Sequence, residues 1–228
     1  MADSNYVAWT ELFSEEAYDP YVVQLYLGKK FNFDSLSYLY NNADLVAKRA
    51  SKRILSAFMN TPLDEIIETV RKTDMEPVTS SEFPWFYSIE EVMFIETAVL
   101  VDGPLTNEEL GMRSPLCRLK SKANTQRFGQ AHSNMLSIMG LVEHVDSKNH
   151  LTPVGAEYDR LSVHQRIDVF TKMLFRIPLM RDVYRNDPKD IDFLYKLTDG
   201  VMKHSSVQRR SVCIRQLVDE IESHRHTR

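Results

Sequence analysis

The sequence predicts a mainly helical protein with one short β-hairpin and with helical parts on either side of a central segment. Only seven glycines and nine prolines occur among its 228 residues. Its apolar residues recur mostly at intervals of three and four, the spacing that places side chains on one face of a helix. A hairpin is expected at 141–152, where two short apolar stretches flank a polar turn.

The composition limits the kind of protein. A hydrophobic content of 43% is typical of a globular core, and no apolar run reaches the length of about 18 residues that a membrane span needs. The start of the chain is acidic, unlike a signal peptide, so we predict a cytoplasmic protein with no membrane partner.

Cys117 and Cys213 lie far apart, in no metal-ligand spacing. No nucleotide-binding or hydrolase motif occurs, so we expect no enzyme and no cofactor.

Residues 1–73 are predicted to form an N-terminal helical lobe. Helices are expected at 20–28, after Asp34, at 42–59 and from Pro62 to about Lys72. The third of these has an apolar face and a separate basic band. The band consists of Lys48, Arg49, Lys52 and Arg53.

A linker is predicted at 74–87, because this stretch combines Pro77 and Pro84 with a run of serine and threonine. Its end is aromatic, from Phe83 to Tyr87, which is too apolar for a solvated tether. We therefore expect the end of the linker to pack against one of the neighbouring lobes.

The central segment, 88–161, begins with two helix-capping signals. Ser88–Glu91 is a capping box that opens a helix ending before Asp102-Gly103-Pro104. Thr106–Glu109 is a second capping box, which opens a short helix ending near Gly111 or Met112.

A third helix is expected from about Ala123 to Met139, with Gly140 as its stop. Its predicted inward residues are Phe128, Ala131, Met135, Leu136 and Ile138. Its predicted outward residues are Lys122, Gln126, Arg127, Gln130 and Asn134. The hairpin follows, with strands at 141–145 and 150–152 around a turn at 146–149. Residues 162–228 are predicted to form a helical extension, with helices at 166–174, 190–204 and 206–224.

The charge is unevenly distributed along the chain. The net charge of −4 argues against a nucleic-acid partner. However, acidic residues dominate 64–109, whereas 110–142 contains none and carries several cations. Such a local basic stripe is what a phosphate backbone requires, whatever the total charge.

The order helix, short helix, polar helix, hairpin and helix in 88–161 resembles winged helix-turn-helix DNA-binding domains, especially through "GLVEHVDSKNHLTPVG". The resemblance implies that the third helix enters a major groove, where Arg, Asn and Gln can read base edges. The candidate DNA-binding residues around this helix are Arg113, Arg118, Lys120, Lys122, Asn124, Thr125, Gln126, Arg127 and Gln130. The resemblance places Lys148 and Asn149, at the hairpin tip, on the DNA backbone or minor groove.

The part after 150 weakly resembles the helical winged-helix tails appended to restriction-modification enzymes and transporter-type ATPases, through its Leu-Thr-x-x-Gly entry and the pattern around Ser206–Arg210. This resemblance implies a DNA-binding subunit of a phage-defence or DNA-processing complex. A transcription regulator is the other form of the hypothesis, and a repressor would be expected to form a homodimer. The basic band at 48–53 could belong to a second helix-turn-helix, or it could simply be a solvated face.

Two alternatives to DNA binding stay open at this point. The acidic stretch 64–109 and the aromatic start of the chain could make the protein an interaction module for protein partners. Asp146-Ser147-Lys148 has the acidic-x-lysine spacing of Mg²⁺-dependent restriction nucleases, but no acidic residue on a preceding core strand completes such a centre.

Overall fold

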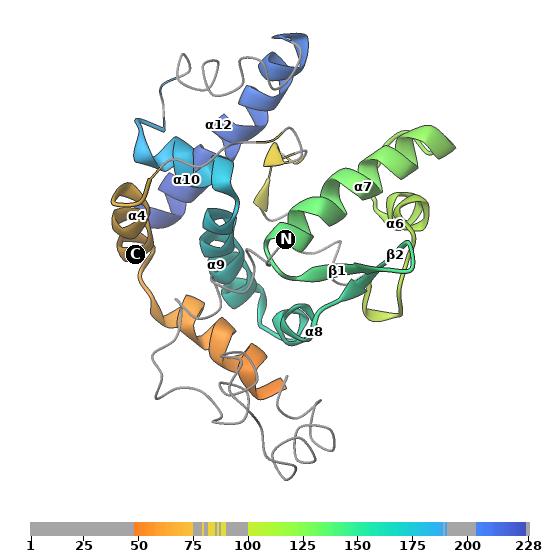
Figure 1. Ribbon diagram of the computed structural model, residues 1–228, viewed down its shortest axis with the longest axis horizontal. Helices are drawn as coiled ribbons and strands as arrows, with labels where there is room; N and C mark the ends of the chain where they lie inside the picture. Colours follow the sequence, from red (N-terminus) through yellow and green to blue (C-terminus); the bar gives the residue numbers. More distant parts are fainter. Residues whose placement is uncertain are drawn as a thin grey trace, which may run out of the picture. The chain divides into compact units, whose positions relative to one another are not determined.

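The computed structural model describes residues 48–74, 79, 82–84, 86, 88–89, 100–188, 190 and 204–226. The chain divides into two compact units, residues 1–60 and 61–228. The described part is mainly α, with one two-stranded antiparallel hairpin (Figure 1). The expected mainly helical class with one β-hairpin is thus confirmed. None of the helices described is both long and apolar enough to cross a lipid bilayer.

In the first unit, residues 48–60 are helical. Ile54, Leu55 and Phe58 are buried, as the apolar spacing predicts, and the four cations of the basic band are all exposed. The helices expected at 20–28 and after Asp34 lie outside the described residues.

The second unit begins with α4 (Leu63–Arg71), close to its predicted position. The helix follows Pro62, carries two acidic residues in its first turn and ends on Arg71, which suits the helix dipole. Its buried residues, Leu63, Ile67 and Val70, form the face of an amphipathic helix, and α4 packs against α10 (Pro178–Arg185).

The central segment contains α6 (Asn107–Arg113) and α7 (Lys122–Ile138). The predicted capping box of α6 is confirmed. The Thr106 side chain accepts a hydrogen bond from the Glu109 backbone N–H, and the Glu109 side chain accepts one from the Thr106 backbone N–H. The stop after α7 is also confirmed, because Gly140 has a φ of 81°, a conformation that favours glycine. Most of the helix predicted after Ser88 lies outside the described residues.

The hairpin consists of β1 (Val142–Val145) and β2 (Lys148–Leu151), with Val145 opposite Lys148. The expected four-residue turn is corrected to two residues, Asp146 and Ser147, with φ of 49° and 63°. Positive φ at both positions gives a turn whose twist matches that of the strands, so the strands can pair right up to it. As a result, Lys148 and Asn149 belong to β2 and not to the turn.

The remaining elements of the second unit are helical. They are α8 (Pro153–Asp159), α9 (Val163–Met173), the 3₁₀ turn η3 (Leu174–Arg176), α10 and α12 (His204–His226). The last of these confirms the helix predicted at 206–224, whereas the helix expected at 190–204 falls mainly on residues that are not described. Figure 1 shows α6, α7 and the hairpin on one side of this unit and α4, α9, α10 and α12 on the other.

Two aromatic residues near the end of the predicted linker lie in the core. Phe83 and Phe86 are almost fully buried. The Phe86 ring lies 6.1 Å from the His132 ring of α7 and also 6.1 Å from the Phe170 ring of α9. Phe86 therefore joins the central segment to the C-terminal helices, in agreement with the expectation that the end of this stretch would pack.

Candidate nucleic-acid interface

The backbones of α6 and α7 approach each other very closely at two glycines. A Cβ atom on Gly111 would lie 2.1 Å from the carbonyl oxygen of Thr125, and one on Gly129 would lie 1.9 Å from that of Asn107. Both distances are far below van der Waals contact, so only glycine fits at either point. The orientation of α7 on α6 is thereby held by backbone contact.

A polar cluster ties the hairpin to this helix pair. The side-chain oxygen of Asn107 accepts hydrogen bonds from Ser133 Oγ at 3.0 Å and from Asn149 Nδ2 at 2.9 Å. Asn149 Nδ2 also donates to the Leu105 carbonyl at 3.0 Å, and the backbones of Leu105 and Asn149 form a β-bridge. Asn149 is 1% exposed. The structure thus places this predicted DNA contact inside the fold, where it positions β2.

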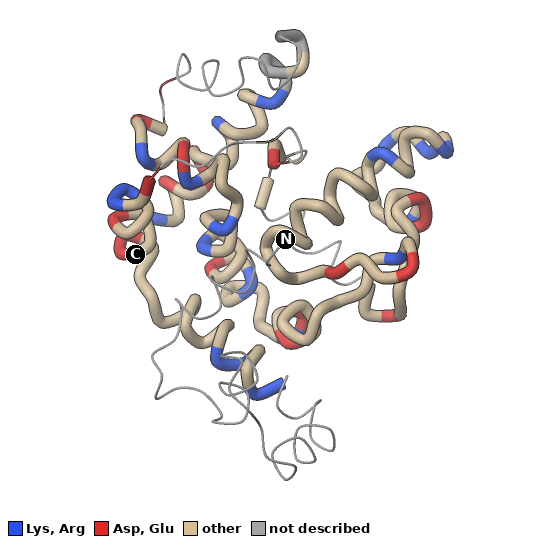
Figure 2. Tube along the Cα trace, in the orientation of Figure 1, with Lys and Arg blue, Asp and Glu red and all other residues tan. Residues whose placement is uncertain are grey.

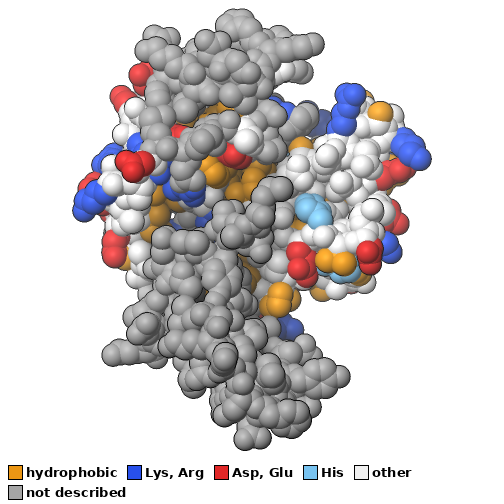
Figure 3. Space-filling model, viewed as in Figure 1, with side chains coloured by type: hydrophobic (Ala, Val, Ile, Leu, Met, Phe, Trp, Pro, Cys, Tyr) orange, Lys and Arg blue, Asp and Glu red, His pale blue; other side chains and the backbone are white. Residues whose placement is uncertain are grey.

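The outward face of α7 is polar and positively charged. Lys122, Gln126, Arg127 and Gln130 are exposed, as predicted. Arg127 and the exposed Arg118, in the preceding loop, make no hydrogen bond or ion pair with the described residues. Lys122 lies 3.6 Å from Glu108 of α6, yet its side chain remains 84% exposed. Basic residues gather at the outer end of α7 (Figure 2), and Figure 3 shows Lys and Arg side chains projecting there.

Lys120 has a different environment from the other cations of this face. Its Nζ donates to three carbonyl oxygens, those of Gly111 at 2.9 Å, Met112 at 2.7 Å and Ser114 at 2.6 Å. A cation suits this position, because the last carbonyls of α6 carry the negative end of the helix dipole. We therefore reassign Lys120 from a DNA contact to a cap on α6.

The inward face of α7 differs from the prediction. Thr125 is fully buried and its hydroxyl donates to the carbonyls of Ser121 and Lys122, so this predicted base-reading residue is turned into the fold. Asn124 is half-buried. Gly129 and His132 belong to the buried set, whereas Phe128 is half-buried and stacks on His132 with ring centroids 3.9 Å apart. Because α7 packs closely against α6, the small residues Thr125, Gly129 and Ser133 form part of its buried face.

The remaining candidates of the central segment lie around the hairpin and the end of α6. Arg113 and Lys148 are exposed, but so are Glu109, Glu143 and Asp146. The hydrogen bonds that Glu109 accepts from Thr106 lower the pKa of its carboxyl, with a smaller effect from Lys148 and Arg113. These two cations thus lie in a mixed electrostatic environment, unlike Arg118 and Arg127.

Within the part of the chain that is described, no cluster of three or more metal-ligating residues is found.

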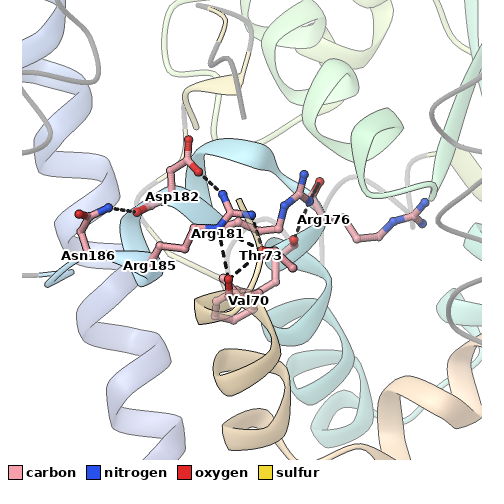
Figure 4. Close-up of polar contacts among 8 residues, drawn as sticks. Val70, Thr73, Arg176, Arg181, Asp182, Arg185 and Asn186 are labelled. Atoms are coloured by element: carbon pink, nitrogen blue, oxygen red, sulfur yellow. Dashed lines mark hydrogen bonds and ion pairs between the residues drawn. The ribbon is translucent and has the colours of Figure 1, made fainter. Parts of the chain in front are cut away.

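The structure also contains an arginine cluster that was not predicted (Figure 4). Arg176 Nη1 donates to the Met139 carbonyl at 2.7 Å, and Arg181 Nη1 donates to the carbonyls of Phe175 and Arg176. Burial, together with the nearby Arg181, lowers the pKa of Arg176. Arg185 bonds to Val70, Thr73 and Asp182. Arg176 thus joins η3 to the end of α7, Arg181 joins α10 to η3, and Arg185 joins α10 to the end of α4. No local sequence motif marks these contacts, because their partners lie on other elements.

Comparison of the chain with known protein families, with curated proteins and with solved structures finds no match.

Proposed function

We propose that this is a non-enzymatic DNA-binding protein whose segment 88–161 acts as a winged helix-turn-helix, with α7 in a major groove. The observation that supports this most is the exposed face of α7 and its preceding loop. It combines Arg118, Lys122 and Arg127 with Gln126 and Gln130, in a stretch with no acidic residue. Arginine and glutamine can each make two hydrogen bonds to a base edge, and the cations suit phosphates.

The rigid seating of α7 supports the same function. Base reading requires side chains that are held in place, and a helix locked by two glycine contacts loses little entropy on binding. The hairpin contributes less on this proposal, since only Lys148 offers a phosphate contact and its neighbours Glu143 and Asp146 oppose one. The protein would act as a transcription regulator or as the DNA-binding subunit of a defence or DNA-processing complex.

The test is binding to a fluorescent random-sequence duplex of about 30 base pairs over a series of salt concentrations. The variant is R118Q/R127Q, which leaves the Lys122–Glu108 pair intact. The control is K72Q/R215Q, which removes two exposed cations elsewhere in the same unit. Each phosphate contact contributes about 0.9 to the slope of log affinity against log salt, so the variant should lower the slope by about 1.8. The control should leave it unchanged.

Two results would contradict the proposal. Equal weakening by both double variants would mean that the duplex senses overall charge and not the α7 face. Absence of salt-sensitive binding by the folded wild-type chain would instead favour the interaction module for protein partners, whose apolar contacts depend little on salt.

A further inference from the structure

Leu119 is the most exposed of the large apolar side chains in the described residues. It is 68% exposed and lies between Arg118 and Lys120, three residues before α7 begins. Isolated apolar residues on a surface are common. Leu119 differs from such residues in that the backbone on either side of it is held and its neighbours in the chain are cationic.

The loop that carries Leu119 is anchored on both sides of it. Cys117 is buried, its backbone N–H donates to the Ser114 carbonyl at 3.3 Å, and its Sγ donates to the Leu119 carbonyl at 3.4 Å. On the other side, the Lys120 ammonium is bound to three carbonyl oxygens at the end of α6. The residues on both sides of Leu119 thus hold its backbone in place, while its side chain is exposed to solvent.

The surroundings of Leu119 indicate the kind of partner. Arg118 and Lys122 flank it in the loop and at the start of α7, and no acidic residue occurs between 110 and 142. Lys122 lies 3.6 Å from Glu108 of α6, and its side chain remains 84% exposed. A partner must therefore combine negative charge with an apolar group. Duplex DNA has both, because phosphates border a major groove in which each thymine exposes a C5 methyl group.

We propose that Leu119 contacts thymine C5 methyl groups in the major groove and so gives the protein a preference for thymine where α7 enters. This inference rests on the proposed DNA-binding function and specifies one base that it reads. The contact needs little ordering of the protein, since the loop is already held by Cys117 and Lys120.

The test compares two alternating duplexes of about 30 base pairs, one of adenine and thymine and one of adenine and uracil, which lacks the methyl group. Burial of one methyl group corresponds to about fourfold in affinity. We expect wild type to bind the thymine duplex about fourfold more tightly. We expect Leu119→Ala to bind both duplexes alike, and Leu119→Met to retain the preference. The salt dependence should be the same in all three proteins.

The control is Val163→Ala, which shortens another exposed apolar side chain, 46% exposed on α9. It should keep the wild-type preference. Equal binding of the two duplexes by wild type, or an unchanged preference in Leu119→Ala, would overturn the role of Leu119 while leaving salt-sensitive DNA binding in place. Self-association of the wild-type chain that is lost in Leu119→Ala, measured by sedimentation velocity with DNA binding unchanged, would overturn the proposal and assign Leu119 to a protein interface. No binding of either duplex would refute the proposed function itself.

Discussion

Arginines occur on or beside both α7 and α10, but the two groups have opposite environments. Arg181 and Arg185 of α10 bond to carbonyl oxygens, to Thr73 and to Asp182. In contrast, Arg118 and Arg127 at α7 are exposed and make no hydrogen bond or ion pair with the described residues. A basic residue is a candidate for a phosphate contact only when it is exposed and the fold does not already use all of its donors. Local sequence does not report this difference, because it depends on where distant carbonyls and carboxylates lie.

The largest expected effect comes from removing a buried cation of α10. The side chains of Arg185 and Asp182 are 6% and 0% exposed. Arg185→Met would leave the Asp182 carboxylate buried without this partner and would remove the hydrogen bonds that Arg185 donates to Val70 and Thr73 at the end of α4. We expect a loss of about 3–5 kcal/mol in the free energy of unfolding, measured by urea denaturation.

Arg127→Met is the matched control, and it should change stability by less than about 0.5 kcal/mol. Similar small effects of both substitutions would contradict the distinction between the two groups of arginines.

The second prediction concerns the contact that holds the α7 face in place. An added methyl group at Gly129 would overlap the backbone of Asn107, which no side-chain movement can relieve. Gly129→Ala should therefore lower stability by about 2–3 kcal/mol, although alanine ordinarily stabilises a helix relative to glycine. Thermal unfolding followed by circular dichroism tests this, with the exposed neighbour Gln130→Ala as control. Stabilisation by Gly129→Ala would show that the two helices are not in such close contact.

The third prediction concerns Lys120, which we place with the cations that are bonded within the fold and not with the exposed cations of the α7 face. Its three bonds to carbonyls place it with the structural cations, so Lys120→Met should cost about 1–2 kcal/mol in the free energy of unfolding. Lys122→Met removes the same charge from the same face but should leave stability within about 0.5 kcal/mol, since exposed ion pairs contribute little. If the two variants unfold at the same urea concentration, Lys120 is not a cap.

Signals that act within a few residues of the chain were readable from the sequence. They include the capping box at Thr106–Glu109, the stop at Gly140 and the start of α4 after Pro62. The hairpin was also expected, but its turn was misjudged. Asp146 and Ser147 adopt left-handed backbone conformations without the glycine that normally marks such a turn.

The sequence by itself determined the helical class, the place of the hairpin and the basic, acid-free stretch that contains α7, because these follow from periodicity, capping and composition. Only the tertiary structure decided which polar residues face solvent. Asn149 meets Leu105 and Asn107, and Gly129 meets the backbone of Asn107, from more than twenty positions away along the chain. Contacts of this kind have no local pattern, since they arise where separate elements pack together.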